Sequence, residues 1–283
     1  MKTLYTLLLA AFVAIQAQAQ TVKIAYPNWP EGIAITYLAK ALIEDELEYR
    51  VELTQAEPEA IFASLASGDQ DVFLDAWLPY THAAYWKQYY DQLERLGTVM
   101  PHGKTGLAVP AYVKVQDLYA LNKLAPELGG KIIGIETDAG ITRKTNTAIR
   151  EYKLELTQSN TSTEAMITAL DAAIQAEKPI VVTAWTPHWM FAKYDLRLLP
   201  DPQNVYQAEG LRKLARLGFS KEMPEVAHIL NQFSLTESQL NELLLQIEES
   251  GKGAEAVTQA WLEAHPELRQ QWTAKKSFWK RLF

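Results

Sequence analysis

The run Asp71-Val72-Phe73-Leu74-Asp75-Ala76 is typical of a buried β-strand, and it ends at Trp77, directly before the turn Leu78-Pro79. The same order of an apolar run, a tryptophan and a proline turn occurs twice more, at Trp29 and at Trp185. In an open α/β sheet, ligands bind outside the carboxyl ends of the strands. We therefore expect the three indoles to form a box of aromatic faces at that edge. Such a box can hold a quaternary ammonium group, which has no N–H to donate.

Strand-like and helix-like segments alternate along the chain on both sides of these runs. The alternation is typical of parallel βαβ units with helices on both faces of a sheet, which predicts an α/β protein. In a first block we expect strands at 22–26, 50–54 and 71–76 and helices at 33–45, 59–67 and 81–96. In a second block we expect strands at 131–136, 155–158 and 180–184 and helices at 143–152 and 164–175.

The two blocks are joined by crossings of the chain, so we expect two α/β lobes, each a sheet flanked by helices. The run 105–109 is predicted to lead into the second block, and the chain returns around 205–217. The C-terminal part is predicted to be helical, with Pro224 opening one helix and Thr236 and Gln239 forming a capping box at the next. A cleft between two lobes is a common setting for a small-ligand site.

The first 19 residues have the features of a cleavable signal peptide. Lys2 supplies a positive charge, residues 4–15 are apolar but short for a membrane span, and Ala17-Gln18-Ala19 is a small-x-small cleavage site. We expect a mature protein that starts at Gln20 and is exported to the periplasm; an N-terminal membrane anchor is the alternative. The chain has no cysteine, which argues against a lipid anchor and against disulfide bonds.

Charge and missing motifs argue against several classes of protein. The formal net charge is −7, which disfavours a nucleic-acid partner and mildly favours a cationic ligand. None of the five histidines stands in an H-E-x-x-H motif, and no serine lies in G-x-S-x-G. Without cysteine, a structural zinc site is not expected either. We therefore expect neither a metal nor a cofactor.

The loop Thr137-Asp138-Ala139-Gly140-Ile141-Thr142 leads from a predicted strand straight into a helix. Free backbone N–H groups at a helix start, with the helix dipole behind them, can bind an anion. Gly140 lets the backbone approach that anion closely. From the residues alone, an ordinary strand-to-helix turn is an equal alternative.

Four strings after residue 19 have a distinctive composition. They are Trp77-Leu78-Pro79-Tyr80-Thr81-His82, Trp185-Thr186-Pro187-His188-Trp189-Met190-Phe191, Lys104-Thr105-Gly106-Leu107-Ala108-Val109-Pro110 and Gly218-Phe219-Ser220-Lys221. They resemble the binding-protein component of glycine betaine and choline-type ABC transporters. The resemblance implies a type II, Venus-flytrap periplasmic binding protein, in which residues 20–108 and 207–283 form lobe 1 and residues 109–206 form lobe 2.

The resemblance also implies roles for six residues. Family members cage the trimethylammonium group with aromatic rings and hold the ligand carboxylate with backbone amides, assisted by a histidine. The matching positions are Trp29, Trp77 and Trp185 for the cage, and Gly140, Ile141 and His82 for the carboxylate. Because this set is divided between the lobes, a ligand that contacts all of it favours lobe closure.

Glu31, which follows Trp29 and Pro30, has no counterpart in this pattern. If its side chain points into the cleft, it disfavours a carboxylate ligand and favours choline, a cation with a hydroxyl group. If it points to solvent, it is only a charge near a helix start. We expect the solvent position, since isolated acidic residues usually face water.

The resemblance thus predicts a periplasmic solute-binding protein of an ABC importer, monomeric and without enzymatic activity. We expect it to capture glycine betaine, for osmoprotection or nutrition, and to deliver it to an inner-membrane permease with its ATPase. Choline, carnitine, proline betaine or a sulfonium osmolyte is the alternative ligand. Alternatives of other classes are a receptor-coupled sensor subunit and a secreted hydrolase that uses His82 or His188 with Asp75 or Asp138. The tail 275–283 has no assigned role, and packing on lobe 1 is the simplest expectation for it.

Overall fold

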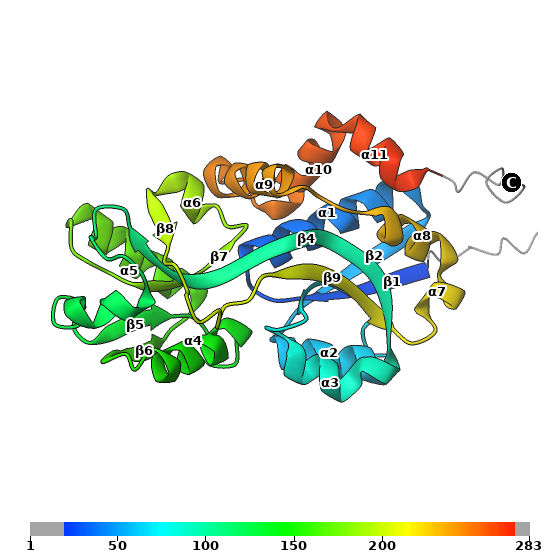
Figure 1. The fold of residues 1–283 in the computed structure, drawn as a ribbon. Helices are drawn as coiled ribbons and strands as arrows, with labels where there is room; N and C mark the ends of the chain where they lie inside the picture. Colours follow the sequence, from blue (N-terminus) through cyan, green and yellow to red (C-terminus); the bar gives the residue numbers. More distant parts are fainter. Residues whose placement is uncertain (1–19, 275–283) are drawn as a thin grey trace, which may run out of the picture.

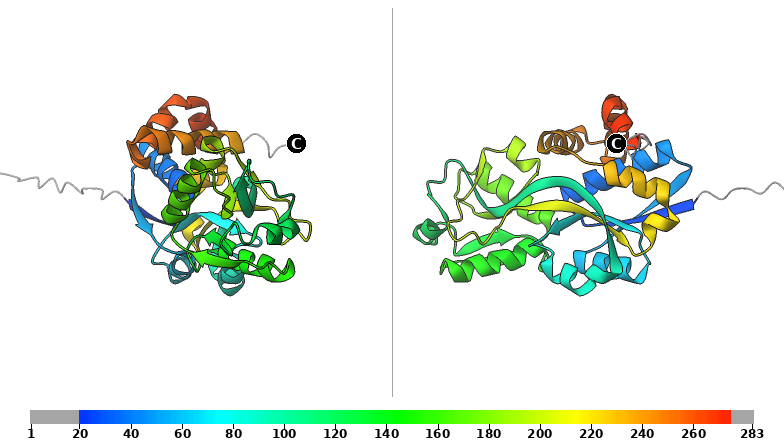
Figure 2. Two further views of the ribbon diagram at one scale, coloured as in Figure 1. Left: turned by 90° about the vertical axis from the view of Figure 1, so that its left-hand side faces the viewer. Right: turned by 45° about the vertical axis from the view of Figure 1, so that its right-hand side comes forward.

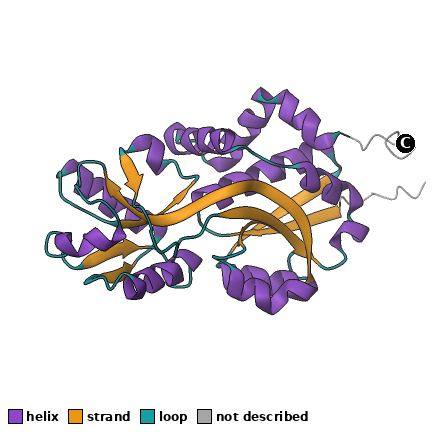
Figure 3. Ribbon diagram, in the orientation of Figure 1, coloured by secondary structure: helices purple, strands orange, loops and turns teal. Residues whose placement is uncertain are grey.

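The computed structural model describes residues 20–274; the predicted signal peptide 1–19 and the tail 275–283 lie outside the described residues. Two α/β lobes lie next to each other, and one long strand, β4 (Leu93–Pro110), runs from one into the other (Figures 1 and 2). Each lobe has strands at its centre and helices around them (Figure 3). The predicted fold class, a two-lobed α/β protein, is confirmed.

The sheet of lobe 1 has the strand order β2-β1-β3-β9-β4. β1 (Gln20–Tyr26) pairs in parallel with β2 (Tyr49–Gln55) and with β3 (Val72–Leu78), as the alternation predicts. β9 (Glu209–Arg216) returns from lobe 2 and is antiparallel to both β3 and β4 (Leu93–Pro110). Because β1 and β3 are parallel, their carboxyl ends meet at one edge of the sheet.

β4 belongs to both lobes. From Leu93 to Gly103 it pairs with β9, and from Lys104 to Ala108 it pairs with β7 (Val182–Thr186) of lobe 2. The change of partner thus lies five residues before the boundary that we predicted between residues 108 and 109. The sheet of lobe 2 continues from β7 to β5 (Lys131–Gly134), which is parallel to it, and then to β6 (Thr157–Asn160), while the short β8 (Leu196–Leu198) pairs with β4.

The predicted helix over residues 81–96 is wrong in its second half. α3 covers only Ala83–Tyr89, a 3₁₀ turn (η1) covers Tyr90–Gln92, and β4 begins at Leu93. Leu93 and Leu96 have helical spacing, but both are buried against the sheet, where Leu93 pairs with Arg216 of β9. A tertiary strand partner therefore overrides the local periodicity.

Helices cover both faces of the lobe 1 sheet. α1 (Pro30–Glu46) lies on one face together with the C-terminal helices, and α2 (Pro58–Ser67) lies with α3 on the other (Figure 1). The capping box of Thr236 and Gln239 is confirmed by its two hydrogen bonds. The C-terminal helices are α7 (Phe219–Glu222), α8 (Pro224–Gln232), α9 (Glu237–Ser250), α10 (Ala254–Ala264) and α11 (Pro266–Thr273).

Lobe 2 contains α4 (Gly140–Glu151), α5 (Thr163–Gln175), the short α6 (Met190–Lys193) and a 3₁₀ helix (η2) over Leu118–Leu124. α4 begins three residues earlier than predicted, so that Gly140 and Ile141 lie in its first turn. Between residues 20 and 274, no helix combines the length and the apolar character that crossing a membrane requires.

Candidate functional site

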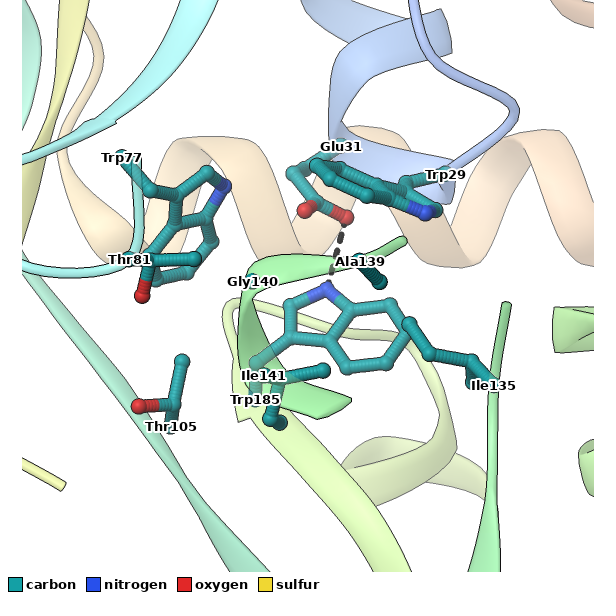
Figure 4. A pocket seen from close by; sticks show the side chains of 10 residues that line it. All are labelled: Trp29, Glu31, Trp77, Thr81, Thr105, Ile135, Ala139, Gly140, Ile141 and Trp185. Carbon is teal, nitrogen blue, oxygen red and sulfur yellow. Dashed lines mark hydrogen bonds between the residues drawn. The ribbon is translucent and has the colours of Figure 1, made fainter. Parts of the chain in front are cut away.

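A pocket lies between the lobes, where the predicted strand ends meet (Figure 4). The cavity itself holds about 20 Å³, close to the room for one water molecule, within about 270 Å³ of space that is partly open to solvent. Its walls are mainly apolar and aromatic. The lining residues are Trp29, Glu31, Trp77, Thr81, Thr105, Ile135, Ala139, Gly140, Ile141 and Trp185.

The three tryptophans at strand ends do lie together around this pocket. Trp29 immediately precedes α1, Trp77 is near the end of β3, and Trp185 is in β7, so two rings come from lobe 1 and one from lobe 2. All three side chains are buried. The indole of Trp77 fits because Gly103 of β4 has no side chain: a Cβ there would stand 2.6 Å from the ring.

His82 does not line the pocket but lies behind Trp29. The two rings are stacked, with centroids 5.9 Å apart, and Nδ1 of His82 accepts a hydrogen bond of 3.0 Å from the backbone N–H of Trp77. The turn after β3 folds back on itself, which directs the imidazole into lobe 1. Burial, together with the nearby cations Arg143 and Lys144, lowers the pKa of His82 to about 3, so the ring is neutral.

Glu31 faces the pocket, and our expectation that it points to solvent is wrong. Its side chain is 1% exposed, and its Oε2 accepts a hydrogen bond of 2.8 Å from Nε1 of Trp185 across the two lobes (Figure 4). Pro30 starts α1 immediately after Trp29, so Glu31 falls in the first turn on the side that faces the strand ends. Burial raises the pKa of Glu31 to about 7, although the indole N–H groups of Trp185 and Trp77 lower it in part.

A second carboxyl group, Asp75, lies beside Glu31 beneath the pocket. It is 0% exposed, and neither of its oxygens has a hydrogen-bond partner among the described residues. Burial and the negative charge of Glu31 raise the pKa of Asp75 well above its usual range. An isolated buried carboxylate is strongly disfavoured, and this burial favours the protonated form of Asp75.

Helix α4 brings free backbone N–H groups to the opposite wall of the pocket. Its N-cap, Ala139, has no side chain that could cap the helix, and its first turn contains no acidic residue. Gly140 lies so close to lobe 1 that a Cβ would stand 2.1 Å from Cγ2 and 2.5 Å from the carbonyl oxygen of Thr81. Glycine is therefore required for this approach of the lobes, and the N–H groups of Gly140 and Ile141 remain available to an acceptor.

A polar network that we did not predict joins α4 to lobe 1. Glu209 of β9 is buried and accepts hydrogen bonds from the backbone N–H of Thr81 (2.8 Å) and from Nζ of Lys144 (2.6 Å). Arg143 donates to the hydroxyl of Tyr85 (3.1 Å) and to the carbonyl of Thr81 (3.3 Å). These partners are 58 to 128 residues apart in the chain, and no local motif marks them.

The contacts that a hydrolase would need are not formed in the part of the chain that the structure describes. Nε2 of His82 and Nε2 of His188 have no hydrogen-bond partner there, and neither have the oxygens of Asp75. Burial lowers the pKa of His188 to about 3. Within residues 20–274, no group of three or more histidine, aspartate or glutamate side chains is arranged to hold a metal ion.

The chain is similar to known proteins in sequence. Residues 20–264 match a family model described as the substrate binding domain of the ABC-type glycine betaine transport system. The glycine betaine/carnitine transport binding protein GbuC of Listeria monocytogenes serotype 1/2a (strain 10403S) is 35% identical over 158 residues, which are 54% of this chain and 52% of GbuC. The match thus spans about half the length of this relative.

Two solved structures are similar over most of the chain. Lactococcal OpuAC, in its closed-liganded conformation complexed with glycine betaine, has a TM-score of 0.85 and 30% identity, over 90% of this chain and 99% of its own. An ABC-transporter choline binding protein in complex with choline has a TM-score of 0.82 and 26% identity, over 89% of this chain and 91% of its own. Similar folds therefore accompany two different quaternary ammonium ligands.

Proposed function

The chain belongs to the family of substrate-binding domains of ABC-type glycine betaine transport systems, and we propose that it captures a quaternary ammonium compound between its lobes for an ABC importer. As a member of this family it is a binding protein and not an enzyme. In this proposal residues 1–19 direct the chain to the periplasm, and the loaded monomer presents its ligand to a membrane permease with its ATPase.

The observation that carries the proposal is the meeting of Trp29, Trp77 and Trp185 in one pocket. A cation over a desolvated indole contributes about 2 kcal/mol or more. Three such contacts, together with a grip on the other end of the ligand, are enough for micromolar affinity, which corresponds to about −8 kcal/mol. Because the cavity is small, entry of a trimethylammonium group must separate Trp185 from Glu31.

We propose glycine betaine as the ligand, because the pocket offers partners for both of its ends. The rings and Glu31 surround the trimethylammonium group, and the N–H groups of Gly140 and Ile141 at the start of α4 take the carboxylate. His82 acts from behind the pocket by fixing Trp29 and the Trp77 backbone, in place of the direct contact that the resemblance implies.

Choline is the second candidate, and a specific observation favours it. Glu31 provides a carboxylate inside the pocket, which attracts a ligand with a net positive charge more than a zwitterion. Carnitine, proline betaine and sulfonium analogues test the size and the chemistry of the same two ends. Tighter binding of choline than of glycine betaine would mean that Glu31 at the start of α1 dominates recognition. The reverse order would mean that the N–H groups at the start of α4 dominate it.

Titration calorimetry with these five ligand types on the wild type decides between the candidates. Tryptophan fluorescence then follows the preferred ligand in Trp29→Ala, Trp77→Ala and Trp185→Ala. Each substitution is expected to weaken binding on the order of 10–100-fold, at roughly 1.4 kcal/mol per tenfold. Trp86→Ala, a partly exposed indole outside the pocket, is the matched control and should change affinity little. Unaltered affinity in all three pocket variants refutes the aromatic cage.

A further inference from the structure

Two buried carboxyl groups lie together at the pocket, Glu31 in its wall and Asp75 beneath it, and the family resemblance assigns no role to either of them. Glu31 is 1% exposed and reaches the pocket, and Asp75 is 0% exposed and has no hydrogen-bond partner among the described residues for either oxygen. Gly32 makes this proximity possible, since a Cβ there would stand 2.9 Å from Oδ2 of Asp75. The first turn of α1 is thus packed tightly onto the end of β3.

Among residues 20–274, no cation acts on the pKa of either member of this pair. The groups that face Glu31 are the indole N–H groups of Trp77 and Trp185, with Asp75 from β3, and the imidazoles behind Trp29 and Trp185 are both neutral. On α1 itself, the nearest ion pair is that of Lys40 with Glu44 and Glu255, about two and a half turns away from Glu31. On the α4 side, Lys144 is paired with Glu209, and Arg143 is bonded to Thr81 and Tyr85.

Two ionised carboxylates that lie together in a buried site without a counterion repel each other strongly, so at least one proton stays on the pair. Asp75 is the deeper of the two, does not line the pocket and keeps its proton. Glu31 is the member that reaches the pocket, where a cation in the cage can take the place of its proton.

We propose that Glu31 and Asp75 form a proton-holding pair and that a quaternary ammonium ligand enters the pocket in exchange for the proton of Glu31. The exchange rests on the proposed function. The ammonium group enters, the Glu31 carboxylic acid becomes a carboxylate, and the proton passes to the solvent, so that the positive charge gained beside Glu31 equals the charge of the proton lost. In glycine betaine the carboxylate lies at the other end of the ligand, at the N–H groups of Gly140 and Ile141. Asp75 remains a neutral acid in both states and acts as a positioning residue.

The exchange makes affinity depend on pH in a defined direction. Burial raises the pKa of Glu31 to about 7, so below this value the ligand must displace a proton. Affinity is then expected to fall by roughly tenfold for each pH unit well below 7 and to level off above it. Glycine betaine and choline do not themselves titrate in this range, and a released proton must come from the protein.

Titration calorimetry with choline and with glycine betaine, at about pH 6 in two buffers of different ionisation enthalpy, counts the released protons. We expect close to one proton per ligand bound in the wild type and none in Glu31→Gln. Asp75→Asn should still release a proton, with a midpoint close to that of the wild type, because a neutral amide replaces a neutral acid. The matched control is Glu59→Gln, which removes an exposed glutamate at the same position after a helix-starting proline and should behave as the wild type.

Ligand binding without proton release in the wild type at about pH 6 overturns the exchange while the proposed function stands. A release that persists in Glu31→Gln overturns the assignment to Glu31. If neither probe binds at any pH, the proposed function fails, and the exchange fails with it.

Discussion

Two helices begin at the pocket, and their first turns carry opposite charge. α1 starts with Pro30, which has no N–H, and Glu31, whose carboxyl group faces the rings. α4 starts with Gly140 and Ile141, has no acidic residue in its first turn, and continues with Arg143 and Lys144. Both helix starts have the same positive end of the dipole. At α4 the free N–H groups of Gly140 and Ile141 suit an anion, whereas at α1 the carboxyl group of Glu31 outweighs the dipole and suits a cation.

The largest effect on ligand affinity is expected from Gly140→Ala, which places a side chain in the first turn of α4, where this helix start approaches lobe 1. The new Cβ would lie 2.5 Å from the carbonyl oxygen of Thr81, and a backbone atom moves only if the lobes separate. Affinity should fall on the order of a thousandfold, about 4 kcal/mol, as measured by calorimetry. Thermal unfolding should change little, because opening of the lobes relieves the clash.

Thr81→Ser, combined with Gly140→Ala in a double variant, tests which atom of Thr81 causes this clash. The substitution removes the methyl group that would lie 2.1 Å from the new Cβ but leaves the carbonyl oxygen in place. The double variant should therefore remain as weak as Gly140→Ala. Recovery of binding in the double variant would mean that the side chain of Thr81, and not its backbone, sets the approach of the lobes.

The α4 wall could be predicted from the sequence far better than the α1 wall. The strand-to-helix loop with Gly140 is a local pattern, and so are the apolar runs that end in Trp29, Trp77 and Trp185. The position of Glu31 is not local. Proline followed by glutamate starts four helices, and only the glutamate of α1 is buried; those at 59, 225 and 267 are exposed. The difference comes from Trp185, which is 154 residues away in sequence.

The same reason explains why the contacts between the lobes were missed. Lys144 and Glu209 form a buried ion pair only because β9 returns to lobe 1 beside the turn that follows β3. The long strand β4 is a second example of a distant partner that decides local structure. Its first residues have helical spacing, but they form a strand because they pair with β9. Periodicity predicts which face of an element is buried but not which distant element covers it.

The second-largest effect is expected from Glu31→Gln, which changes the α1 wall of the pocket and the pH dependence of the free energy of unfolding. The pKa of Glu31 is raised from 4.5 to about 7, so the folded state holds a proton that the unfolded state releases. The stability that this proton contributes is fully present below pH 4.5 and is lost as the pH rises through about 7. Glu31→Gln cannot ionise and should be more stable than the wild type at about pH 8, by on the order of 3 kcal/mol.

Urea unfolding at about pH 4 and about pH 8 measures this difference, which should nearly vanish at the lower pH. Glu59→Gln serves as the control, because it removes an exposed charge from the equivalent position of α2. A stabilisation of the same size at both pH values would show that Glu31 stays ionised in the folded protein. The α1 start would then carry a full negative charge at the pocket even without a ligand.

The smallest effect is expected from Arg143→Met, which tests whether the α4 wall also holds the lobes together. Arg143 donates to the hydroxyl of Tyr85 and the carbonyl of Thr81, and both partners belong to lobe 1. These bonds exist only while the lobes are close, so their loss should weaken ligand binding by about fivefold, near 1 kcal/mol. Arg150→Met is the matched control on the same helix, since Arg150 bonds only to Asn146 and Thr147 within α4. Equal effects of the two substitutions would assign the loss to the general charge of α4. A loss confined to Arg143 would mean that the α4 start also holds the lobes together around the ligand, whereas the hydrogen bond between Glu31 and Trp185 at the α1 start joins the lobes only until the ligand separates the two side chains.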